Sequence, residues 1–331
     1  MKKQALVTLR DIADALHLSV NTISCALKER NNLSPETIRR VKEKAFELGY
    51  IPNSVASSIR TGYTKTIAII LGDIANAYFS VMVKELERLI RNEGYVAMIL
   101  VTDEDPRIEN EAIEAALSKN VDGIIIFPTC KTEKGINLIR KRRLPFILIG
   151  RHMQDTKMDY IVSDDVNGGY LATKYLLGKG YKKILLFSGP DYVSSAFERK
   201  QGYLKGMDEA GIPVKDLIIP CDITINEKTD KQIVIALNSH KNFDAIFTYN
   251  DIIAFRIIRL TRRMGPDIPD IIGYDNIQSK IDFGFDISSV NIYKTLMAEK
   301  ATAWLFSRIR HEIKPDEYLN EVVPVDLHIK E

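Results

Sequence analysis

The chain has 331 residues, of which 45% are hydrophobic, and this size favours two or three domains with ordinary cores. No apolar run is long enough to span a bilayer, and the N-terminus lacks the apolar stretch of a signal peptide. The three cysteines are unevenly spaced, which excludes a disulfide framework or a metal-ligand motif. We therefore expect a cytoplasmic protein with no metal, no cofactor and no membrane partner.

The first stretch, residues 7–27 (VTLRDIADALHLSVNTISCAL), predicts two short helices joined by a tight turn. Apolar residues recur at helical spacing in both halves of this stretch. Thr8 and Ser19 are suitable N-caps for the first and second helix. A third helix is expected to begin at Ser34-Pro35-Glu36 and to end before Gly49.

Helices this short are unstable alone, so the three are expected to pack together as a helix-turn-helix module. The second helix of such a module enters the major groove of DNA. A small helical cap or dimerisation unit would show the same periodicity. Charge favours DNA: residues 1–60 hold ten Lys and Arg against six Asp and Glu, a net charge of +4, whereas the whole chain has 46 against 44, or +2.

From Thr66 onward, short runs rich in Ile, Val and Phe alternate with amphipathic helical stretches. This alternation predicts two successive α/β subdomains with parallel sheets, with the break near residues 160–165. No dinucleotide-binding, P-loop or nucleophile-elbow motif is found, which argues against an enzyme. The expected strands are Thr66–Leu71, Val96–Val101, Gly123–Phe127, Phe146–Ile149, Lys183–Phe187, Ala245–Thr248 and Ile271–Tyr274.

Polar and aromatic residues follow several of these strands. Ligands of α/β sheets bind outside the carboxyl ends of the strands. Carboxylates, an arginine, an amide and aromatic rings together are suited to a polyhydroxylated or heterocyclic small molecule. Alternatively, Asp251 and Asp275 only cap the helices that follow them. The candidate effector-binding residues are Tyr78, Phe79, Thr129, Arg151, Arg199, Phe247, Asn250, Asp251 and Asp275.

The N-terminal stretch, with NNLSPETIRRVKEKAFELGYIPNSVASSIRTG after it, resembles the signature of the lactose/galactose/purine repressor (LacI/GalR) family of bacterial regulators. The resemblance runs without a gap from Val7 to about Gly62. It implies a homodimeric repressor that binds palindromic operator DNA. It also implies a core like that of periplasmic binding proteins, which senses a small molecule. Residues 54–59 then correspond to a hinge helix that folds on the operator, whereas without the resemblance they would be interpreted as a flexible linker.

The resemblance identifies residues that would contact DNA. Three departures matter: His17 stands at a turn Gly of the family, Cys25 stands where many members have a guanine-reading Arg, and Ile59 replaces the Leu that wedges into the minor groove. A thiol cannot make the bidentate contact of an Arg, so the operator half-site is expected to differ there or to be read less sharply. The candidate DNA-binding residues are Thr8, Ser19, Val20, Asn21, Thr22, Ser24, Cys25, Asn32, Thr37, Asn53, Val55, Ala56 and Ile59.

Beyond residue 64 the resemblance is looser. The effector arginine of the family matches Arg199 in RKQGY, its aspartate matches Asp275 in IIGYD, and its Asn-Asp pair matches Asn250 and Asp251. The expected organisation is a DNA-binding domain at 1–50, a hinge at 51–63, an N-terminal subdomain at 64–162 plus 294–322, and a C-terminal subdomain at 163–293 plus 323–331.

These observations predict a transcriptional regulator whose effector is a sugar or sugar derivative bound between the two subdomains. The alternative is a solute receptor of the periplasmic type with no DNA function. The helix-turn-helix pattern and the missing signal peptide argue against that alternative.

Overall fold

The structure is a computed structural model that describes residues 7–28, 33–52, 58, 62–153, 157–224, 226–240, 243–264, 269–284 and 286–330. It divides into two compact units, Met1–Thr64 and Lys65–Glu331. Among the described residues, no helix is long and apolar enough to cross a membrane.

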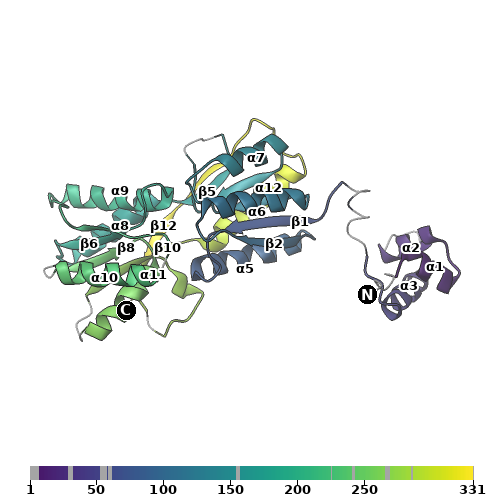
Figure 1. Cartoon of the computed structure of the whole chain (residues 1–331), viewed down its shortest axis with the longest axis horizontal. Helices are drawn as coiled ribbons and strands as arrows, with labels where there is room; N and C mark the ends of the chain where they lie inside the picture. Colours follow the sequence, from purple (N-terminus) through teal and green to yellow (C-terminus); the bar gives the residue numbers. More distant parts are fainter. Residues whose placement is uncertain are drawn as a thin grey trace. The chain divides into compact units, whose positions relative to one another are not determined.

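The described part of the first unit holds three helices, α1 (Leu9–Leu16), α2 (Val20–Leu27) and α3 (Pro35–Glu47) (Figure 1). Each helix begins after a hydroxyl side chain that accepts a hydrogen bond from the backbone N–H three residues on; these side chains are Thr8, Ser19 and Ser34. The predicted helix starts are therefore confirmed. Each such bond satisfies one of the backbone donors left unpaired at a helix start.

The helices of the first unit pack through a small apolar core that includes Ile12, Ile23 and Val41, each with 0% exposure. The turn between α1 and α2 passes through His17, whose φ of 53° lies in the left-handed region. A glycine is free of strain at such an angle, so the histidine here imposes a modest conformational cost.

The second unit contains two six-stranded sheets. The first has the order β11-β5-β4-β3-β1-β2, and all of its strand pairs are parallel. Side chains alternate across it: Ile67 and Ile69 face α5 and α12, while Ala68 and Ile70 face α6 and α7. We call this sheet with its four helices the first lobe. Its elements are β1 (Thr66–Leu71), β2 (Val96–Val101), β3 (Gly123–Ile126), β4 (Phe146–Ile149), β5 (Tyr160–Ser163), β11 (Asn320–Val323), α5 (Ala77–Asn92), α6 (Pro106–Ser118), α7 (Lys134–Arg142) and α12 (Lys294–Ile309).

The second sheet has the order β12-β10-β9-β8-β6-β7, and only its β10–β12 pair is antiparallel. Helices cover both faces, α8 and α9 on one and α10 and α11 on the other (Figure 1). We call this sheet with its helices the second lobe. Its elements are β6 (Ile184–Ser188), β7 (Ile218–Pro220), β8 (Ala245–Thr248), β9 (Asp270–Asp275), β10 (Ser288–Ile292), β12 (Val325–His328), α8 (Asp165–Gly178), α9 (Ser194–Glu209), α10 (Glu227–Ser239), α11 (Asp251–Met264) and the 3-10 turn η1 (Ile277–Ser279).

The chain passes between the lobes three times: after β5, after β10 and after β11. The strands β5 and β11 each extend one residue beyond the expected subdomain boundaries, because Ser163 and Val323 are register partners in the first sheet. The alternating strands and helices after Thr66 therefore fold into two lobes. Three connections join the lobes, and the carboxyl ends of strands in each lobe face the other lobe.

Candidate functional site

The helix α2 of the first unit presents the residues predicted to read DNA bases. Val20, with 43% exposure, and Asn21 are exposed at its N-terminal end. The Cys25 Sγ lies one turn further on, 4.0 Å from the Asn21 Oδ1, and the thiol is only half-buried. Val20, Asn21 and Cys25 therefore form one surface, and none of the three carries a charge.

The remaining residues predicted to contact DNA fall into three groups. Thr8 and Ser19 cap helices, while Thr22 and Thr37 donate the capping N–H groups at the starts of α2 and α3, where backbone donors suit phosphate groups. Ser24 is half-buried on α2. Five predictions lie outside the described residues: Asn32, Asn53, Val55, Ala56 and Ile59.

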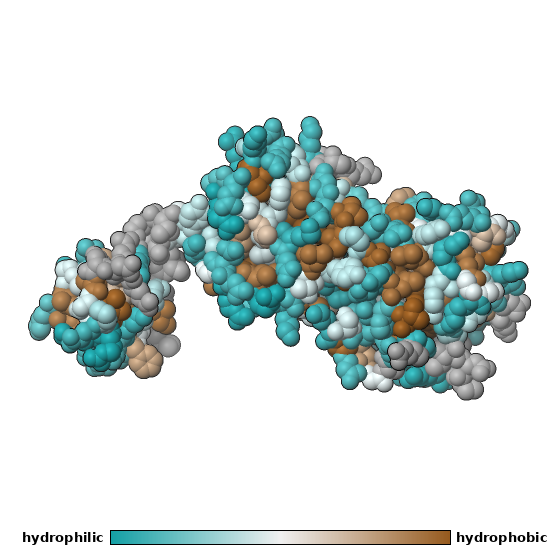
Figure 2. All heavy atoms as spheres, turned by 180° about the vertical axis from the view of Figure 1, so that it is seen from behind, coloured by the Kyte–Doolittle hydropathy of each residue, from teal (hydrophilic) through white to brown (hydrophobic). Residues whose placement is uncertain are grey.

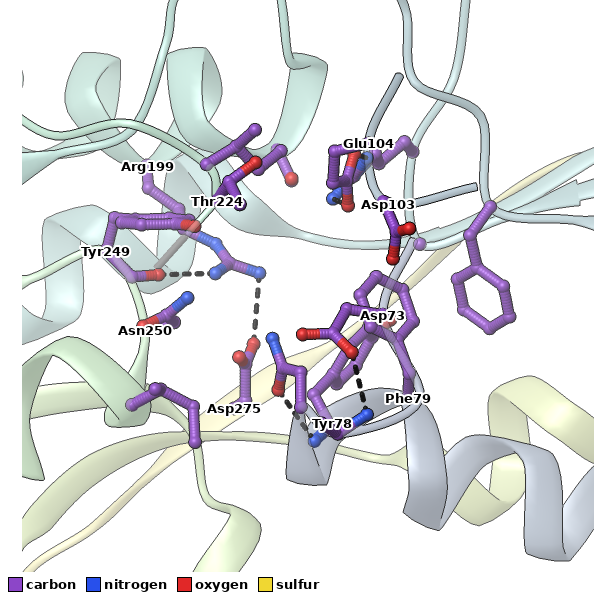
Figure 3. Close-up of a pocket in the computed structure, with 18 of the residues that line it drawn as sticks. Asp73, Tyr78, Phe79, Asp103, Glu104, Arg199, Thr224, Tyr249, Asn250 and Asp275 are labelled. Carbon is purple, nitrogen blue, oxygen red and sulfur yellow. Dashed lines mark hydrogen bonds and ion pairs between the residues drawn. The ribbon is translucent and has the colours of Figure 1, made fainter. Parts of the chain in front are cut away.

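A cavity of about 360 Å³ lies between the lobes, at the carboxyl ends of strands from both sheets (Figure 3). Of the predicted effector residues, six line it: Tyr78, Phe79, Arg151, Arg199, Asn250 and Asp275. The volume is at the lower end of the range of small-molecule sites. The structure thus brings together residues spread over two hundred positions of sequence.

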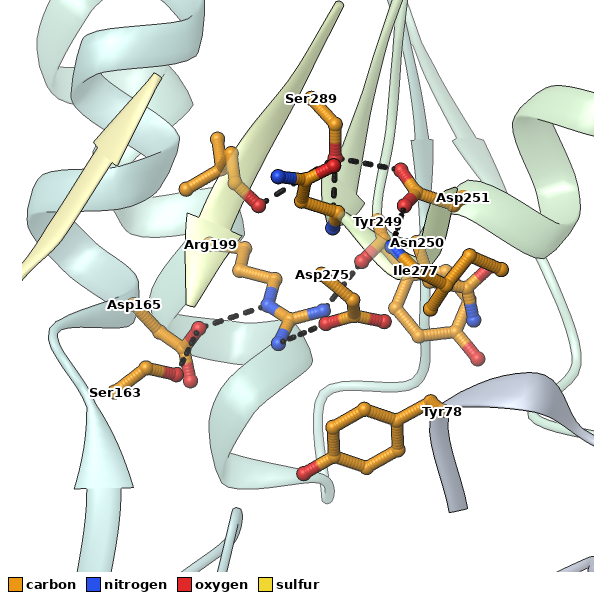
Figure 4. Close-up of polar contacts among 12 residues, drawn as sticks. Tyr78, Ser163, Asp165, Arg199, Tyr249, Asn250, Asp251, Asp275, Ile277 and Ser289 are labelled. Carbon is orange, nitrogen blue, oxygen red and sulfur yellow. Dashed lines mark hydrogen bonds and ion pairs between the residues drawn. The ribbon is translucent and has the colours of Figure 1, made fainter. Parts of the chain in front are cut away.

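Arg199 is the centre of the polar network on the second-lobe side of this cavity (Figure 4). Its Nε donates to Asp165 Oδ1 at 2.9 Å, its Nη2 lies 3.2 Å from Asp275 Oδ1, and its Nη1 donates to the Tyr249 carbonyl at 2.5 Å. The guanidinium also lies over the Tyr274 ring, 3.7 Å from its centroid. All three guanidinium nitrogens are therefore engaged by the protein itself.

Arg199 and the charged groups around it shift one another's pKa values. Burial disfavours the charged form of Arg199, but the neighbouring carboxylates outweigh it and raise the pKa of the guanidinium. Burial also raises the pKa of Asp275, to about 6, although Arg199 and Lys294 favour its charged form. Lys294, at the start of α12, donates to the backbone carbonyls of Asp275 and Asn276.

A second ion pair lies on the first-lobe side of the cavity. Arg151 Nη1 is 2.8 Å from Glu104 Oε2, and Arg151 Nη2 donates to Glu104 Oε1 at 2.9 Å, so the contact is bidentate. Both side chains are nearly buried, with exposures of 11% and 6%. Gly72 is required beside them, because a Cβ at this position would lie 2.2 Å from Glu104 Oε1.

Aromatic rings form the apolar wall. Tyr78 contacts Phe79 and Phe127 edge to face, with centroid separations of 5.1 and 6.0 Å. Gly150, at φ +71°, allows this arrangement, since a Cβ there would lie 2.5 Å from the Tyr78 hydroxyl. The cavity thus combines ring faces with carboxylates and amides, which suits a ligand with a carbon skeleton and many hydroxyl groups.

Three predicted effector residues do not line the cavity, and these predictions are corrected. The Thr129 hydroxyl donates to Glu109 Oε1, and the Thr129 backbone N–H donates to Glu109 Oε2. Phe247, with 0% exposure, points into the apolar core under α8 and α9. Asp251 is fully buried and accepts hydrogen bonds from Ser289 Oγ and the backbone N–H of Ile277. Burial raises the pKa of Asp251 to about 8.

Other residues line the cavity without having been among the candidates; the polar ones are Asp73, Asn76, Asp103, Glu104, Ser195, Thr224, Tyr249 and Arg256. Asp103 and Glu104 follow β2 after one residue, Thr102, so the rule that ligands bind at strand ends could have found them. Among the described residues, no group of three or more His, Cys, Asp or Glu side chains is arranged to hold a metal ion.

Comparison with known proteins decides the family. The model for periplasmic binding proteins and the sugar-binding domain of the LacI family matches residues 64–295. This span is more than two thirds of the chain and contains both lobes' central strands. The chain belongs to the LacI family of transcriptional regulators.

Relatives and solved structures of the LacI family extend the match to the whole chain. The repressor PurR of Glaesserella parasuis serovar 5 (strain SH0165) is 28% identical over 317 residues, covering 94% of this chain and 93% of PurR. The lac repressor dimer bound to operator and the anti-inducer ONPF superposes with a TM-score of 0.82 at 20% identity over 98% of both chains. A LacI family regulator from Enterococcus faecium with bound ribose has a TM-score of 0.68 and 26% identity, covering 80% of this chain and 96% of that one. Members of this family are transcription regulators, and the chain is therefore a regulator and not an enzyme.

The two lobes of this LacI family core also touch beside the cavity. His152 follows Arg151 in the first lobe, and Glu198 precedes Arg199 in α9 of the second lobe. His152 Nε2 lies 2.7 Å from Glu198 Oε1, and the His152 backbone N–H donates to Ser194 Oγ at 2.9 Å. The hydrogen bond with Glu198 raises the pKa of His152. This pair therefore joins the lobes next to two of the cavity arginines, Arg151 and Arg199.

Replacing His152 by glutamine is expected to lower the stability of the core more at about pH 6 than at about pH 8.5. The folded-state pKa of His152 is raised, so its contribution is complete below the unfolded-state pKa and is lost as pH rises through the folded-state pKa. Urea denaturation at both pH values measures the difference. His311→Gln, at an exposed position, is the control. An effect of His152→Gln that is the same at both pH values would contradict the prediction.

Proposed function

We propose that this LacI family regulator is a repressor that binds a palindromic operator as a homodimer and is controlled by a small polyhydroxylated metabolite held between the lobes. The observation that carries the proposal is the presence in one chain of an exposed recognition surface on α2 and an interlobe cavity lined by ring faces and hydrogen-bonding groups. The relatives support the same function: the lac repressor dimer is bound to its operator in one solved structure, and the Enterococcus faecium regulator contains ribose in another.

The proposed base-reading residues are Val20 and Asn21. Asn pairs in a bidentate manner with adenine, and an apolar side chain such as Val20 contacts the methyl group of thymine. Cys25 adds no bidentate donor, so we place no guanine contact at that position. The hinge contacts assigned to Asn53, Val55, Ala56 and Ile59 and the four-part domain organisation remain part of the proposal.

Ligand control follows from the lobe arrangement. A molecule that bridges Tyr78 and Phe79 of the first lobe and Asn250 and Asp275 of the second binds best at one lobe angle. Binding energy is then linked to that angle and, through it, to operator affinity. Arg151 and Arg199 hold the polar walls in place.

Homodimer formation is supported by apolar residues on the surface. Val96 and Ile99 of the edge strand β2 are 68% and 44% exposed, and Ile235 of α10 is 64% exposed. Figure 2 shows apolar residues gathered in patches on the face of the second unit that it presents. Patches of this kind mark protein–protein contacts more often than isolated apolar residues do.

Footprinting of the full-length protein on DNA flanking its own gene tests the proposal, with and without a panel of sugars. We expect protection of two half-sites about one helical turn apart and a steep loss of affinity with salt. Asn21→Ala should cost about 1–3 kcal/mol of operator binding, measured by fluorescence anisotropy. Glu43→Ala, on the exposed surface of α3, is the control. Binding that is equal on every duplex and unchanged by Asn21→Ala would refute sequence-specific recognition.

A further inference from the structure

The three arginines of the interlobe cavity each pair with a carboxylate of the protein, and Asp230, the partner of Arg256, also pairs with Arg259. Arg151 is held by Glu104, Arg199 by Asp165 and Asp275, and Arg256 by Asp230, with Arg256 Nε 2.6 Å from Asp230 Oδ1. An anionic ligand recruits arginine through free N–H groups that match its oxygens. At Arg199 each guanidinium nitrogen already has a protein partner, and at Arg151 both terminal nitrogens do.

Two further carboxylates line the same cavity. Asp73 follows β1 and Asp103 follows β2, and the Asp103 backbone N–H donates to the Gly72 carbonyl at 2.7 Å, so the two loops are adjacent. Figure 3 shows both carboxylates in the cavity region beside Tyr78 and Phe79. Asp73 Oδ1 accepts a hydrogen bond from the Ala75 backbone N–H, and within the described ranges neither carboxylate takes part in an ion pair.

The balance of charge around the cavity is therefore negative. Four carboxylates line it against three guanidiniums, an excess of one negative charge. A phosphate or carboxylate on the ligand would be brought next to Asp73 and Asp103, and Arg151, the cavity arginine of the same lobe, is already paired with Glu104. Hydroxyl and ammonium groups, in contrast, donate to these carboxylates.

We infer that the ligand of this cavity is a polyol that carries an amino group, that the amino group lies against Asp73 and Asp103, and that phosphorylated or carboxylated polyols are rejected. This inference rests on the proposed function, because it takes the interlobe cavity to be the effector site. It goes further by giving the ligand a charge and an orientation. Asp73 and Asp103 then act as specificity-determining residues.

Matched sugars test the inference on the full-length protein. Glucose, galactose and mannose are each compared as the neutral sugar, the 2-amino sugar and the 6-phosphate, by titration calorimetry and by the shift in unfolding temperature. For any of the three sugars that binds, we expect the amino sugar to bind about three- to tenfold more tightly than the neutral sugar. The gain is no larger because Asp73 and Asp103 are exposed to solvent, where ion pairs contribute little. The 6-phosphate should bind at least about tenfold more weakly than the amino sugar.

The double variant Asp73→Asn, Asp103→Asn should lose the preference for the amino sugar. Asp208→Asn, an exposed carboxylate on α9 that does not line the cavity, is the matched control and should keep the preference. A phosphate that binds as tightly as the amino sugar overturns the inference, and so does a panel in which no sugar binds. Footprinting without any sugar decides operator recognition separately, so the failure of this inference would be distinguishable from the failure of the proposed function.

Discussion

Replacing Arg199 by alanine is expected to lower the free energy of unfolding of the core by about 3–5 kcal/mol. Arg199 is 6% exposed, and its guanidinium is the cation that Asp165 and Asp275 share. Without it, the buried Asp165 would lose its ion-pair partner, Asp275 would keep only Lys294 to favour its charged form, and the Tyr249 carbonyl would lose its donor. Urea denaturation of the second unit within the full-length protein measures the loss.

This expectation differs from the one that the sequence alone supports. If Arg199 only bound the ligand, its replacement would remove the ligand response and leave folding and operator affinity almost unchanged. The network makes Arg199 a positioning residue that also supports the core. Adding Asp165→Asn and Asp275→Asn to Arg199→Ala should restore part of the stability, because it removes the uncompensated charges.

A surface arginine supplies the control. Arg310 pairs with Glu93 and Glu312 at exposed positions, and exposed pairs contribute little to stability. Arg310→Ala should therefore leave the urea midpoint unchanged. If Arg199→Ala were as stable as Arg310→Ala, the buried network would have no structural role.

The elements that could be predicted from sequence are those with local signals. The bounds of β1, β2, β4 and β8 agree with the predicted apolar runs to the residue, because each run is continuous and bounded by turn residues. Such runs are typical of strands buried on both faces, which holds for β1, β4 and β8, whereas β2 is an edge strand with exposed residues. The helix starts at Thr8, Ser19 and Ser34 follow from capping chemistry, which also depends only on neighbours in sequence.

Five strands had no such signal and were not predicted: β5, β7, β10, β11 and β12. Strand β10 begins with Ser288 and Ser289, both buried. The Ser289 hydroxyl donates to Asp251, which is 38 residues away, so the burial of a polar strand depends on a partner that only the fold supplies. The antiparallel β12 pairs with β10 across a similar separation in sequence.

The candidate site shows the same difference between features with a local sequence signal and features that depend on distant contacts. The strand-end rule located the cavity, since Tyr78, Asn250 and Asp275 all follow or end strands and all line it. The rule does not say which way a side chain points. Phe247 lies inside β8 and faces the helices, while Asp251 turns toward Ser289. The backbone at Asp103 and Glu104 has left-handed φ angles of 50° and 58°, and this conformation places both residues at the cavity. The sequence pattern does not predict such angles at residues other than glycine.

The packing of α8 against α9 positions both partners of the central ion pair, Asp165 on α8 and Arg199 on α9. Two glycines allow these helices to touch through their backbones. A Cβ at Gly202 would lie 2.1 Å from the Val166 carbonyl oxygen, and one at Gly169 would lie 2.1 Å from the Arg199 carbonyl oxygen. These neighbours are backbone atoms and cannot rotate away, so a larger residue must separate the helices.

Gly202→Ala is therefore expected to destabilise the second unit by about 1–3 kcal/mol through overpacking, measured by urea denaturation. The same separation should move Arg199 relative to Asp165, so ligand affinity measured by calorimetry should fall as well. Helix propensity alone predicts the opposite sign, because alanine favours a helix over glycine. The sign of the stability change thus decides between close packing and propensity.

Gly178 at the end of α8 isolates the propensity effect. No atom lies within 4 Å of the position that its Cβ would occupy, and it does not have a left-handed φ. Gly178→Ala is expected to raise stability by about 0.4–1 kcal/mol and to leave ligand affinity unchanged. If Gly202→Ala and Gly178→Ala shifted stability in the same direction, backbone contact between α8 and α9 would not be what holds Arg199 beside Asp165. If the two substitutions shift stability in opposite directions, the geometry of the cavity wall depends on the close backbone contacts at Gly169 and Gly202.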